Sequence, residues 1–512
     1  MNRSIKYLIL FLVISIGFFS IENAQPKTSP KKVAKQTWHI VERPSFTLMT
    51  DAGEKRTKKM AHNLERFRLM FSHLTNAKLE HTVRPITIIA SKREHTFAFI
   101  KGHSDALKRS TVFFKDSING NYAGLKLFNY KYSEQTNLRA LFHGYTYYAS
   151  ANLTKANSPY WYRKGFADYM STLEFEDELT VNYGKPFHKN VRTLDNEKWV
   201  DLEQVLTTNY VASKHKKLRS QIFAQGWLLT HYLSQDSEKL RLKNRLFKLL
   251  NDGVEPVAAI EQSSGLSFSE FEKDLRKYSR RKLNYQRISL SSPLKNKELA
   301  IRKLSKSEAV YRIGDFILQA GRGHLKARPY FEKALEIDPQ YANAMAGLAN
   351  TYLGKDIAKM TNLIDEAQSI EPDNPWAATV SGHLYSWKRN IENDKATKKI
   401  YWNKAIRNYN LALSSETINL EALLAAASLC WDVKKYDKYI ELIELAYIAA
   451  PSNFEVQSKL IKAYLSNNQH NKAQSLATSL RKDSLISAKS ISKFDDWYEE
   501  LLNEFPEKIQ IK

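Results

Sequence analysis

Residues 327–354, ARPYFEKALEIDPQYANAMAGLANTYLG, decide the fold of the C-terminal part of this chain. Ala327, Phe331 and Ala334 are four and three residues apart and so share one face of a helix, which Pro339 follows. The next apolar face has similar spacing, in Met345, Leu348, Ala349 and Tyr352. Small residues on facing helices let two backbones approach closely, so the stretch predicts a hairpin of two antiparallel helices.

The helix ending at Pro339, which in a tetratricopeptide pattern closes the second helix of a repeat, recurs along the chain. Alanine followed five residues later by proline occurs at Ala334 and Pro339, at Ala367 and Pro372, and at Ala446 and Pro451. This resembles the tetratricopeptide repeat, with a divergent unit at 395–430 and a further one starting near 472. We expect four or five helical pairs over residues 301–512. The resemblance implies an extended concave surface and therefore a protein or peptide partner.

Composition and charge divide the 512 residues into two unequal parts. At 43% hydrophobic and 26% charged, the chain is long enough for two or three globular domains. Residues 301–512 hold 29 Lys and Arg against 26 Asp and Glu, and subtraction from 78 and 54 leaves 49 against 28 for residues 1–300. Of the net charge of +24, residues 1–300 thus carry +21 and residues 301–512 carry +3, which makes an anionic envelope component a candidate partner of the N-terminal part.

The first 25 residues have the pattern of an export signal. Arg3 and Lys6 precede an apolar stretch from Tyr7 to Phe19, too short for a membrane span. Glu22 stands where a cleavage site needs a small residue, so an uncleaved anchor is the alternative. We expect export across the inner membrane, to the periplasm or to its membrane surface. That location argues against a nucleic-acid partner.

Residues 26–37 are polar and Lys-rich and are predicted to be a spacer, and residues 288–300 are predicted to be a linker. Between them, SFTLMTD (45–51) and PITIIAS (85–91) predict strands, and residues 55–74 carry apolar side chains at helical spacing. A mixed sheet with helices, an α+β domain over 38–287, is therefore expected. Cys430, the single cysteine, lies in an apolar helical run and is expected in the core.

The stretch LFHGYTYYAS (141–150) places His143 and Tyr147 one helical turn apart. LRALFHGYTYYASANL (138–153), followed by SPYWYRKGFADYMSTLE (158–174), resembles the gluzincin metallopeptidases, in which one helix carries H-E-x-x-H and the next carries the third zinc ligand. The resemblance covers roughly residues 38–290 and includes FAQGWLLTHYL (223–233). It implies an α+β peptidase-like domain ahead of the repeats.

The working positions of such a site are mostly replaced. The resemblance implies that His143 is the first ligand and Asp168 the supporting acid, but it puts Gly144 at the general base, Tyr147 at the second ligand and Lys164 at the third. Glycine accepts no proton, and an ammonium repels a cation. We therefore expect an inactive peptidase relative without a catalytic residue, a bound metal or another cofactor. Zinc would be expected only under the alternative of a working, altered site.

Three interpretations of this cluster remain open. In the first, the ammonium of Lys164 replaces the charge of the metal, beside His143 and Tyr147 and balanced by Asp168. In the second, His143 recruits a different metal with ligands chosen from His188, Glu174 and Glu176. In the third, His143 is an ordinary core or cleft histidine. The surrounding aromatic residues are expected to be packing material or to line a binding cleft: Tyr145, Tyr147, Tyr148, Tyr160, Trp161, Tyr162 and Tyr169.

No glycine-rich phosphate loop, G-x-S-x-G elbow or pair of cysteine ligands occurs in the sequence. The sequence therefore favours a noncatalytic envelope protein that acts as a protein-binding or peptide-binding scaffold through its repeats. The alternatives are a hydrolase with a non-standard metal site and a basic adaptor for anionic envelope polymers.

Overall fold

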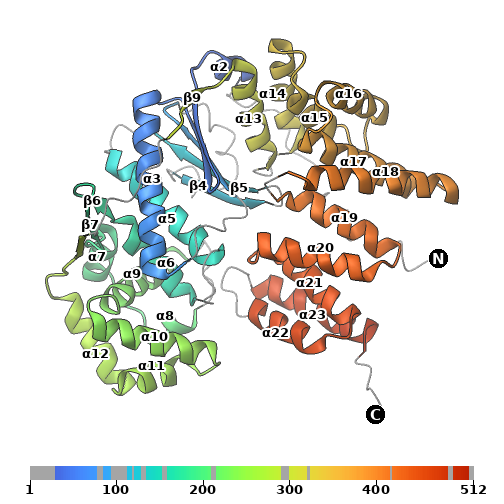
Figure 1. Cartoon of the computed structure of the whole chain (residues 1–512). Helices are drawn as coiled ribbons and strands as arrows, with labels where there is room; N and C mark the ends of the chain where they lie inside the picture. Colours follow the sequence, from blue (N-terminus) through green and yellow to red (C-terminus); the bar gives the residue numbers. More distant parts are fainter. Residues whose placement is uncertain are drawn as a thin grey trace.

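The computed structural model describes residues 29–77, 85–93, 112–117, 120–127, 134–152, 158–208, 215–289, 299–319, 323–415, 418–481 and 488–506. A mixed sheet with helices comes first, and an array of helices follows it (Figure 1). The predicted signal segment and most of the predicted linker, residues 290–298, lie outside the described residues. Within the described ranges, no helix has both the length and the apolar character needed to cross a membrane.

The larger sheet has six strands and mixes both strand directions. Its central strand β3 runs parallel to β2 and β5, and the remaining pairs are antiparallel. In order across the sheet, the strands are β4 (Val112–Ser117), β5 (Gly120–Lys126), β3 (Ile86–Ser91), β2 (Phe46–Thr50), β1 (His39–Arg43) and β9 (Arg302–Lys303). Strands β2 and β3 confirm the predictions from SFTLMTD and PITIIAS.

Both faces of this sheet are covered, because successive side chains of a strand point to opposite sides. Leu48 and Ile88 pack with Phe67 of helix α3 (Glu54–Thr75), the helix predicted over 55–74. Met49 and Ile89, the next residue on each strand, lie in a separate cluster with Val310 of the first repeat helix. The sheet is thus the middle layer between α3 and the repeats (Figure 1).

The rest of the N-terminal part is helical, with one small antiparallel sheet. That sheet contains β6 (Glu174–Phe175), β7 (Thr180–Tyr183) and β8 (Gln286–Ser289). The helices are α2 (Pro30–Ala34), α5 (Glu134–Asn152), α6 (Tyr160–Ser171), α7 (His188–Asn196), α8 (Leu202–Thr207), α9 (Lys216–Tyr232), α10 (Ser237–Asn251), α11 (Pro256–Ser264) and α12 (Phe268–Ser279).

Helices α6 and α9 cross where Gly165 meets Gly226, and a Cβ at position 165 would lie 2.4 Å from the Gly226 carbonyl oxygen.

The C-terminal part is a tetratricopeptide-like array of five helical pairs in the described residues. The pairs are α13 (Lys306–Ile317) with α14 (His324–Ile337), α15 (Ala342–Asn350) with α16 (Ile357–Ile370), α17 (Pro375–Ile391) with α18 (Lys395–Leu413), α19 (Leu420–Asp432) with α20 (Tyr436–Ala449), and α21 (Phe454–Ser466) with α22 (His470–Arg481). Helix α23 (Ala488–Glu504) follows the last pair, and Cys430 is buried in α19. Each of the three predicted alanines, Ala334, Ala367 and Ala446, is fully buried near the end of a second helix.

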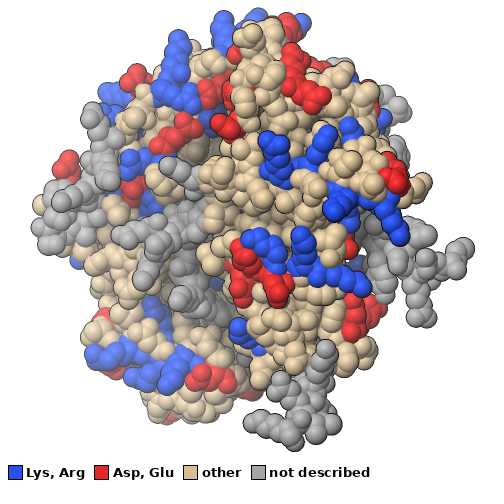
Figure 2. Space-filling view, turned by 45° about the vertical axis from the view of Figure 1, so that its right-hand side comes forward, with Lys and Arg blue, Asp and Glu red and all other residues tan. Residues whose placement is uncertain are grey.

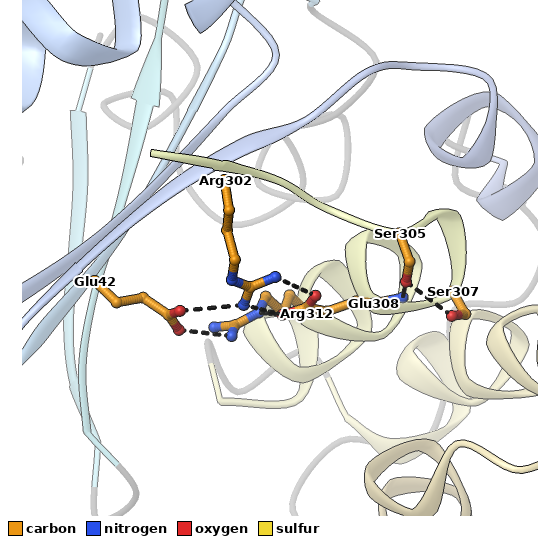
Figure 3. A network of polar contacts seen from close by, with 6 residues as sticks. All are labelled: Glu42, Arg302, Ser305, Ser307, Glu308 and Arg312. Atoms are coloured by element: carbon orange, nitrogen blue, oxygen red, sulfur yellow. Dashed lines mark hydrogen bonds and ion pairs between the residues drawn. The ribbon is translucent and has the colours of Figure 1, made fainter. Parts of the chain in front are cut away.

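The sheet and the array are joined by backbone and by charge. Strand β9 pairs with β1, and the Leu304 amide donates a hydrogen bond to the Trp38 carbonyl, 2.9 Å away. Glu42 of β1 accepts hydrogen bonds from Arg302 at 3.1 Å and from Arg312 of α13 at 2.8 Å (Figure 3). Both arginines also pair with Glu308.

Two segments predicted to connect domains contribute to folded elements. Residues 30–34 of the predicted spacer form α2, whose Val33 is fully buried in the cluster that α13 and α14 share. Residues 288 and 289 of the predicted linker belong to β8. The sequence pattern missed both elements because each is too short to show a period of its own.

Candidate functional site

Helices α5 and α6 bring together the residues predicted at the peptidase-like site. His143 on α5 lies with its Nε2 3.3 Å from Oδ1 of Asp168 on α6. The other oxygen of Asp168 accepts a hydrogen bond of 2.8 Å from the side-chain amide of Asn190 on α7. Asn190 was missed by the sequence analysis, because nothing in its surroundings on α7 has the spacing of a known motif. Asp168 therefore holds His143 and Asn190 in one network.

Lys164 lies on the same side of α6 as Asp168, one turn earlier. Its Nζ is 3.9 Å from the centroid of the Tyr147 ring and 5.5 Å from that of Phe223, so it contacts aromatic faces. Burial lowers the pKa of Lys164 to about 8, and the nearby Asp168 only partly offsets this effect. The ammonium thus lies close to Tyr147 and near Asp168, two of the three neighbours that the first interpretation requires, and its contact with Tyr147 is through the ring.

Gly144 is buried within α5, between His143 and Tyr145, and offers no group that could take a proton.

Most of the aromatic residues around His143 belong to the hydrophobic core. Tyr145, Tyr160, Trp161, Tyr162 and Tyr169 are buried, whereas Tyr147 and Tyr148 are partly exposed. Arg68 of α3 donates a hydrogen bond of 3.0 Å to the Tyr145 hydroxyl.

The carboxylates suggested for a recruited metal site have other partners. Glu174 accepts hydrogen bonds from Arg139, at 3.0 Å, and from Lys185. Burial acts to raise the pKa of Glu174, but these two cations together lower it below its usual value. Glu176 pairs with Arg287 at 3.1 Å. Among the residues that the structure describes, no three His, Cys, Asp or Glu side chains gather as metal ligands would.

A second candidate site lies where the sheet faces the repeats. We call it the sheet–repeat cleft; it consists of two cavities, of about 430 and 320 Å³, that share Thr87, Tyr311 and Asp315. The larger cavity is lined by Thr47, Met49, Thr87, Ile89, Glu308, Tyr311, Arg312, Asp315, Tyr341 and Asn343. The smaller cavity is lined by Pro85, Thr87, Gly120, Tyr122, Tyr311, Asp315, Gln319, Pro375, Trp376, Ser415, Ile418, Asn419 and Glu421.

The repeats contribute to this cleft through the first helix of each of the first four pairs. Asp315 comes from α13, Asn343 from α15, Trp376 from α17 and Glu421 from α19. Helices in that position line the concave side of a repeat array. The concave surface therefore does not face open solvent along its whole length, because strands β2, β3 and β5 form the opposite wall (Figure 1).

Polar contacts hold the repeat wall of the cleft in place. His383 of α17 lies between the Tyr409 hydroxyl and Glu421, with both contacts at 2.9 Å. Asn419 donates a hydrogen bond of 2.7 Å to Thr379, and so joins α19 to α17. Side chains that are locked in this way keep a binding surface in one geometry.

Charge on the outer surface is mixed. On the face shown in Figure 2, acidic and basic side chains are interspersed over the described surface rather than gathered in one patch of a single sign. The basic composition of the N-terminal part is therefore not visible on that face as one continuous anion-binding surface.

Comparison with known protein families and with curated proteins found no match. Among solved structures, the chain is similar to TTC0263, a tetratricopeptide protein of Thermus thermophilus, at 19% identity and a TM-score of 0.31, over 38% of this chain and 99% of that one. It is similar to pilF of Pseudomonas aeruginosa at 18% identity and a TM-score of 0.30, over 40% of this chain and 93% of that one. These similarities concern the repeat fold of the C-terminal part, and nothing in the comparisons supports a gluzincin-like N-terminal domain.

Proposed function

We propose that this chain is a noncatalytic, peptidase-like envelope protein that binds an extended segment of a partner protein in the sheet–repeat cleft. The observation that carries the proposal is the pair of adjoining cavities, whose walls together come from the sheet and from four successive repeats. Repeat arrays of this kind recognise partner proteins on the concave side. A second wall makes the surface a channel, which suits one extended chain better than a globular surface.

The lining of the cleft fits a peptide backbone. The side-chain amides of Asn343 and Asn419 line the cleft; each already makes hydrogen bonds within the repeats, and a second N–H and a second lone pair of each amide can still serve a ligand. Tyr311 and Trp376 offer apolar faces. An extended peptide needs both kinds of contact, because its backbone groups must be paired while alternate side chains are buried. About 320 to 430 Å³ in each cavity is room for a few side chains rather than for a folded domain.

The noncatalytic part of the proposal is supported by the surroundings of His143. Its Nε2 pairs with Asp168, Gly144 supplies no base, and Lys164 lies over Tyr147 where a metal ligand would be needed. Export to the envelope is supported by the sequence of residues 1–25 and remains part of the proposal.

A display selection tests the proposal. Random twelve-residue peptides displayed on phage are selected on the purified chain, and the enriched peptides are synthesised and titrated. Thr87, which lines both cavities, is changed to Arg to fill the cleft; Thr207→Arg on α8 is the matched control at an exposed threonine outside the lining. We expect Thr87→Arg to weaken binding at least about tenfold and Thr207→Arg to leave it unchanged. Peptides that bind both variants equally, or a selection that enriches none, would contradict the proposal.

A further inference from the structure

The charges that line the sheet–repeat cleft differ in sign from the chain as a whole. The chain carries +24, yet three carboxylates line the cleft, those of Glu308, Asp315 and Glu421. Arg312 is the single Lys or Arg among the described lining residues. A negative cavity in a basic protein selects against anionic ligands and in favour of cationic ones.

Arg312 and Glu308 are already paired with each other, and neither Asp315 nor Glu421 has a lysine or arginine partner among the described residues; His383 contacts one oxygen of Glu421. Figure 3 shows Arg312 between Glu42 and Glu308, with nitrogen–oxygen distances of 2.8 and 2.9 Å. Arg302 contacts the same two carboxylates. The two arginines and the two glutamates of this network neutralise one another at one end of the larger cavity. The charge of the smaller cavity is therefore set by Asp315 and Glu421.

The smaller cavity combines these two carboxylates with three aromatic side chains. Tyr122, Tyr311 and Trp376 line it, on β5, α13 and α17. Aromatic faces attract organic cations such as ammonium and guanidinium groups, and the attraction is strongest where water is excluded. Carboxylates beside aromatic faces are therefore suited to a cation carried on an apolar stem.

Two polar atoms on this wall lack a partner among the described residues. Nε1 of Trp376 and Oε2 of Glu421 are both buried without a hydrogen bond, although Oε1 of Glu421 contacts His383. A buried carboxylate oxygen without a donor costs free energy. A ligand that donates a hydrogen bond to Oε2 of Glu421 would remove that cost, whereas the Trp376 N–H needs an acceptor, such as a carbonyl of the peptide backbone.

Asp315 is also incompletely paired. Its two oxygens accept hydrogen bonds from the Tyr122 hydroxyl at 3.3 Å and from the Gln319 amide at 3.4 Å, both longer than usual. Burial raises the pKa of Asp315 to about 6, more than Gln319, Tyr122 and Arg312 together lower it, and Glu421 adds to the rise. The carboxylate is thus ionised at neutral pH at some cost, which a bound cation would reduce.

We propose that the smaller cavity of the sheet–repeat cleft binds the side chain of a lysine or arginine in the partner peptide, with its charge between Asp315 and Glu421 and its stem against the aromatic wall. The inference rests on the proposed function, because it names the residue class by which the cleft selects its peptide. A hard metal ion is a poorer occupant, since it requires several oxygen ligands and gains nothing comparable from tyrosine and tryptophan faces.

Titrations followed by ligand-observed NMR test the assignment on the full chain. The probes are acetyl-Gly-Gly-Lys-Gly-Gly-amide, the same peptide with arginine or with uncharged norleucine in place of lysine, and n-butylammonium alone. The variants are Asp315→Asn and Glu421→Gln, which keep the shape of each side chain, and their combination. Glu366→Gln is the matched control, because Glu366 is exposed on α16 and does not line the cleft. Circular dichroism of each variant checks that it is folded.

We expect the lysine and arginine peptides to bind at least about tenfold tighter than the norleucine peptide, and the double variant to lose this preference while Glu366→Gln keeps it. Equal binding of the lysine and norleucine peptides would overturn the inference and leave the proposed function standing. Binding of n-butylammonium that depends on Asp315 but is not accompanied by binding of any peptide would overturn the assignment to a peptide. If no probe binds, the cation site is rejected, and the display selection separately decides whether the cleft binds peptides at all.

Discussion

The hydroxyl of Tyr122 on β5 donates a hydrogen bond of 3.3 Å to the carboxylate of Asp315 on α13, across 193 residues of sequence. Around it, the Tyr122 ring packs edge-on against Phe316, with ring centroids 6.0 Å apart. Because Phe316 is fully buried in the cluster that contains Ile89 of the sheet, the first repeat serves as part of the sheet's own core. The N-terminal part and the array are therefore expected to unfold together rather than as independent units.

Replacing Phe316 by alanine tests this coupling. The substitution leaves a cavity between β5 and α13 and should lower the free energy of unfolding by about 3 to 5 kcal/mol. Ile448→Ala on α20 is the control, because Ile448 is 63% exposed and its loss should cost less than about 0.5 kcal/mol. Denaturant unfolding followed by circular dichroism and by tryptophan fluorescence measures both. Two separate transitions in the wild type, only one of which moves in Phe316→Ala, would contradict the coupling.

The features that could be predicted from the sequence are those that local spacing encodes. Ala334 allows a close helix crossing and Pro339 follows the end of the same helix, so both requirements lie within a few residues of each other in the sequence. Such a short-range spacing can be recognised without knowing the structure. The strand at 86–91 was visible from its β-branched run for the same reason. His143 and Asp168 were found only through the resemblance of their surroundings, and the structure does place them in contact.

The sheet–repeat cleft could not be predicted in this way. Tyr122 and Asp315 belong to segments with different periodicities, and nothing in either segment indicates that they meet. The two-residue strand β9 lies at the start of the region that was predicted to be all repeats, and its pairing with β1 brings α13 onto the sheet. Long-range pairing of so short a strand leaves no pattern in the sequence.

Lys164 offers a test of whether its charge or its length is needed. Its pKa is lowered to about 8, so the folded state holds this proton less tightly than the unfolded chain does. We expect Lys164→Met, which keeps the apolar stem and removes the buried charge, to stabilise the chain at pH 7 by about 1 to 2 kcal/mol. Lys164→Ala should be about 1 to 2 kcal/mol less stable than Lys164→Met, because the contacts of the stem with Tyr147 and Phe223 are lost. Equal destabilisation by both would show that the charge of Lys164, rather than its stem, is needed at this position, as the first interpretation of the cluster requires.

A triple substitution tests whether the geometry of a zinc site persists around His143. The change is Gly144→Glu, Tyr147→His and Lys164→Glu, which restores the residue types of a working metallopeptidase on α5 and α6. Since His143 contacts Asp168 and Lys164 contacts Tyr147, the new ligands should converge on one metal. We expect about one zinc per triple variant and none in the wild type by elemental analysis after dialysis. Tight zinc binding by the wild type would reject the noncatalytic proposal.

His231 of α9 should make stability depend on pH. It is fully buried, with Nε2 2.9 Å from the Gly184 carbonyl and Nδ1 2.7 Å from the Tyr278 hydroxyl. Burial lowers its pKa from 6.5 to about 4, and the hydrogen bond to Gly184 only partly opposes this effect. Between those values the unfolded state binds a proton that the folded state excludes, so stability is complete above pH 6.5 and falls as the pH drops towards 4.

Protonation linked to His231 should lower the free energy of unfolding by about 3 kcal/mol between pH 6.5 and pH 4. Unfolding in denaturant at pH 7 and pH 4.5 measures it, and His231→Gln should show a smaller decrease between the two pH values than the wild type. His188→Gln, at an exposed histidine on α7, should keep the decrease of the wild type. An unchanged pH dependence in His231→Gln would reject the role of this histidine.

Asp315 should cost stability at neutral pH. Its pKa is raised by burial from 3.8 to about 6, despite the hydrogen bonds from Gln319 and Tyr122 and the charge of Arg312, and with Glu421 adding to the rise. Between pH 3.8 and 6 the folded state binds a proton that the unfolded state has released, so stability from this group falls as the pH rises through that window. Asp315→Asn removes the ionisable group and should stabilise the chain at pH 7.5 by about 1 to 2 kcal/mol.

That gain should disappear below about pH 4, where the carboxyl group is protonated in both states. Denaturant unfolding of Asp315→Asn and of the wild type at pH 7.5 and pH 3.5 provides the comparison, with Asp365→Asn, at an exposed position on α16, as the control. A variant that is more stable but loses the preference for lysine peptides would show that this carboxylate is kept for binding rather than for folding. A destabilised Asp315→Asn would instead show that the ionised group supports the sheet–repeat contact.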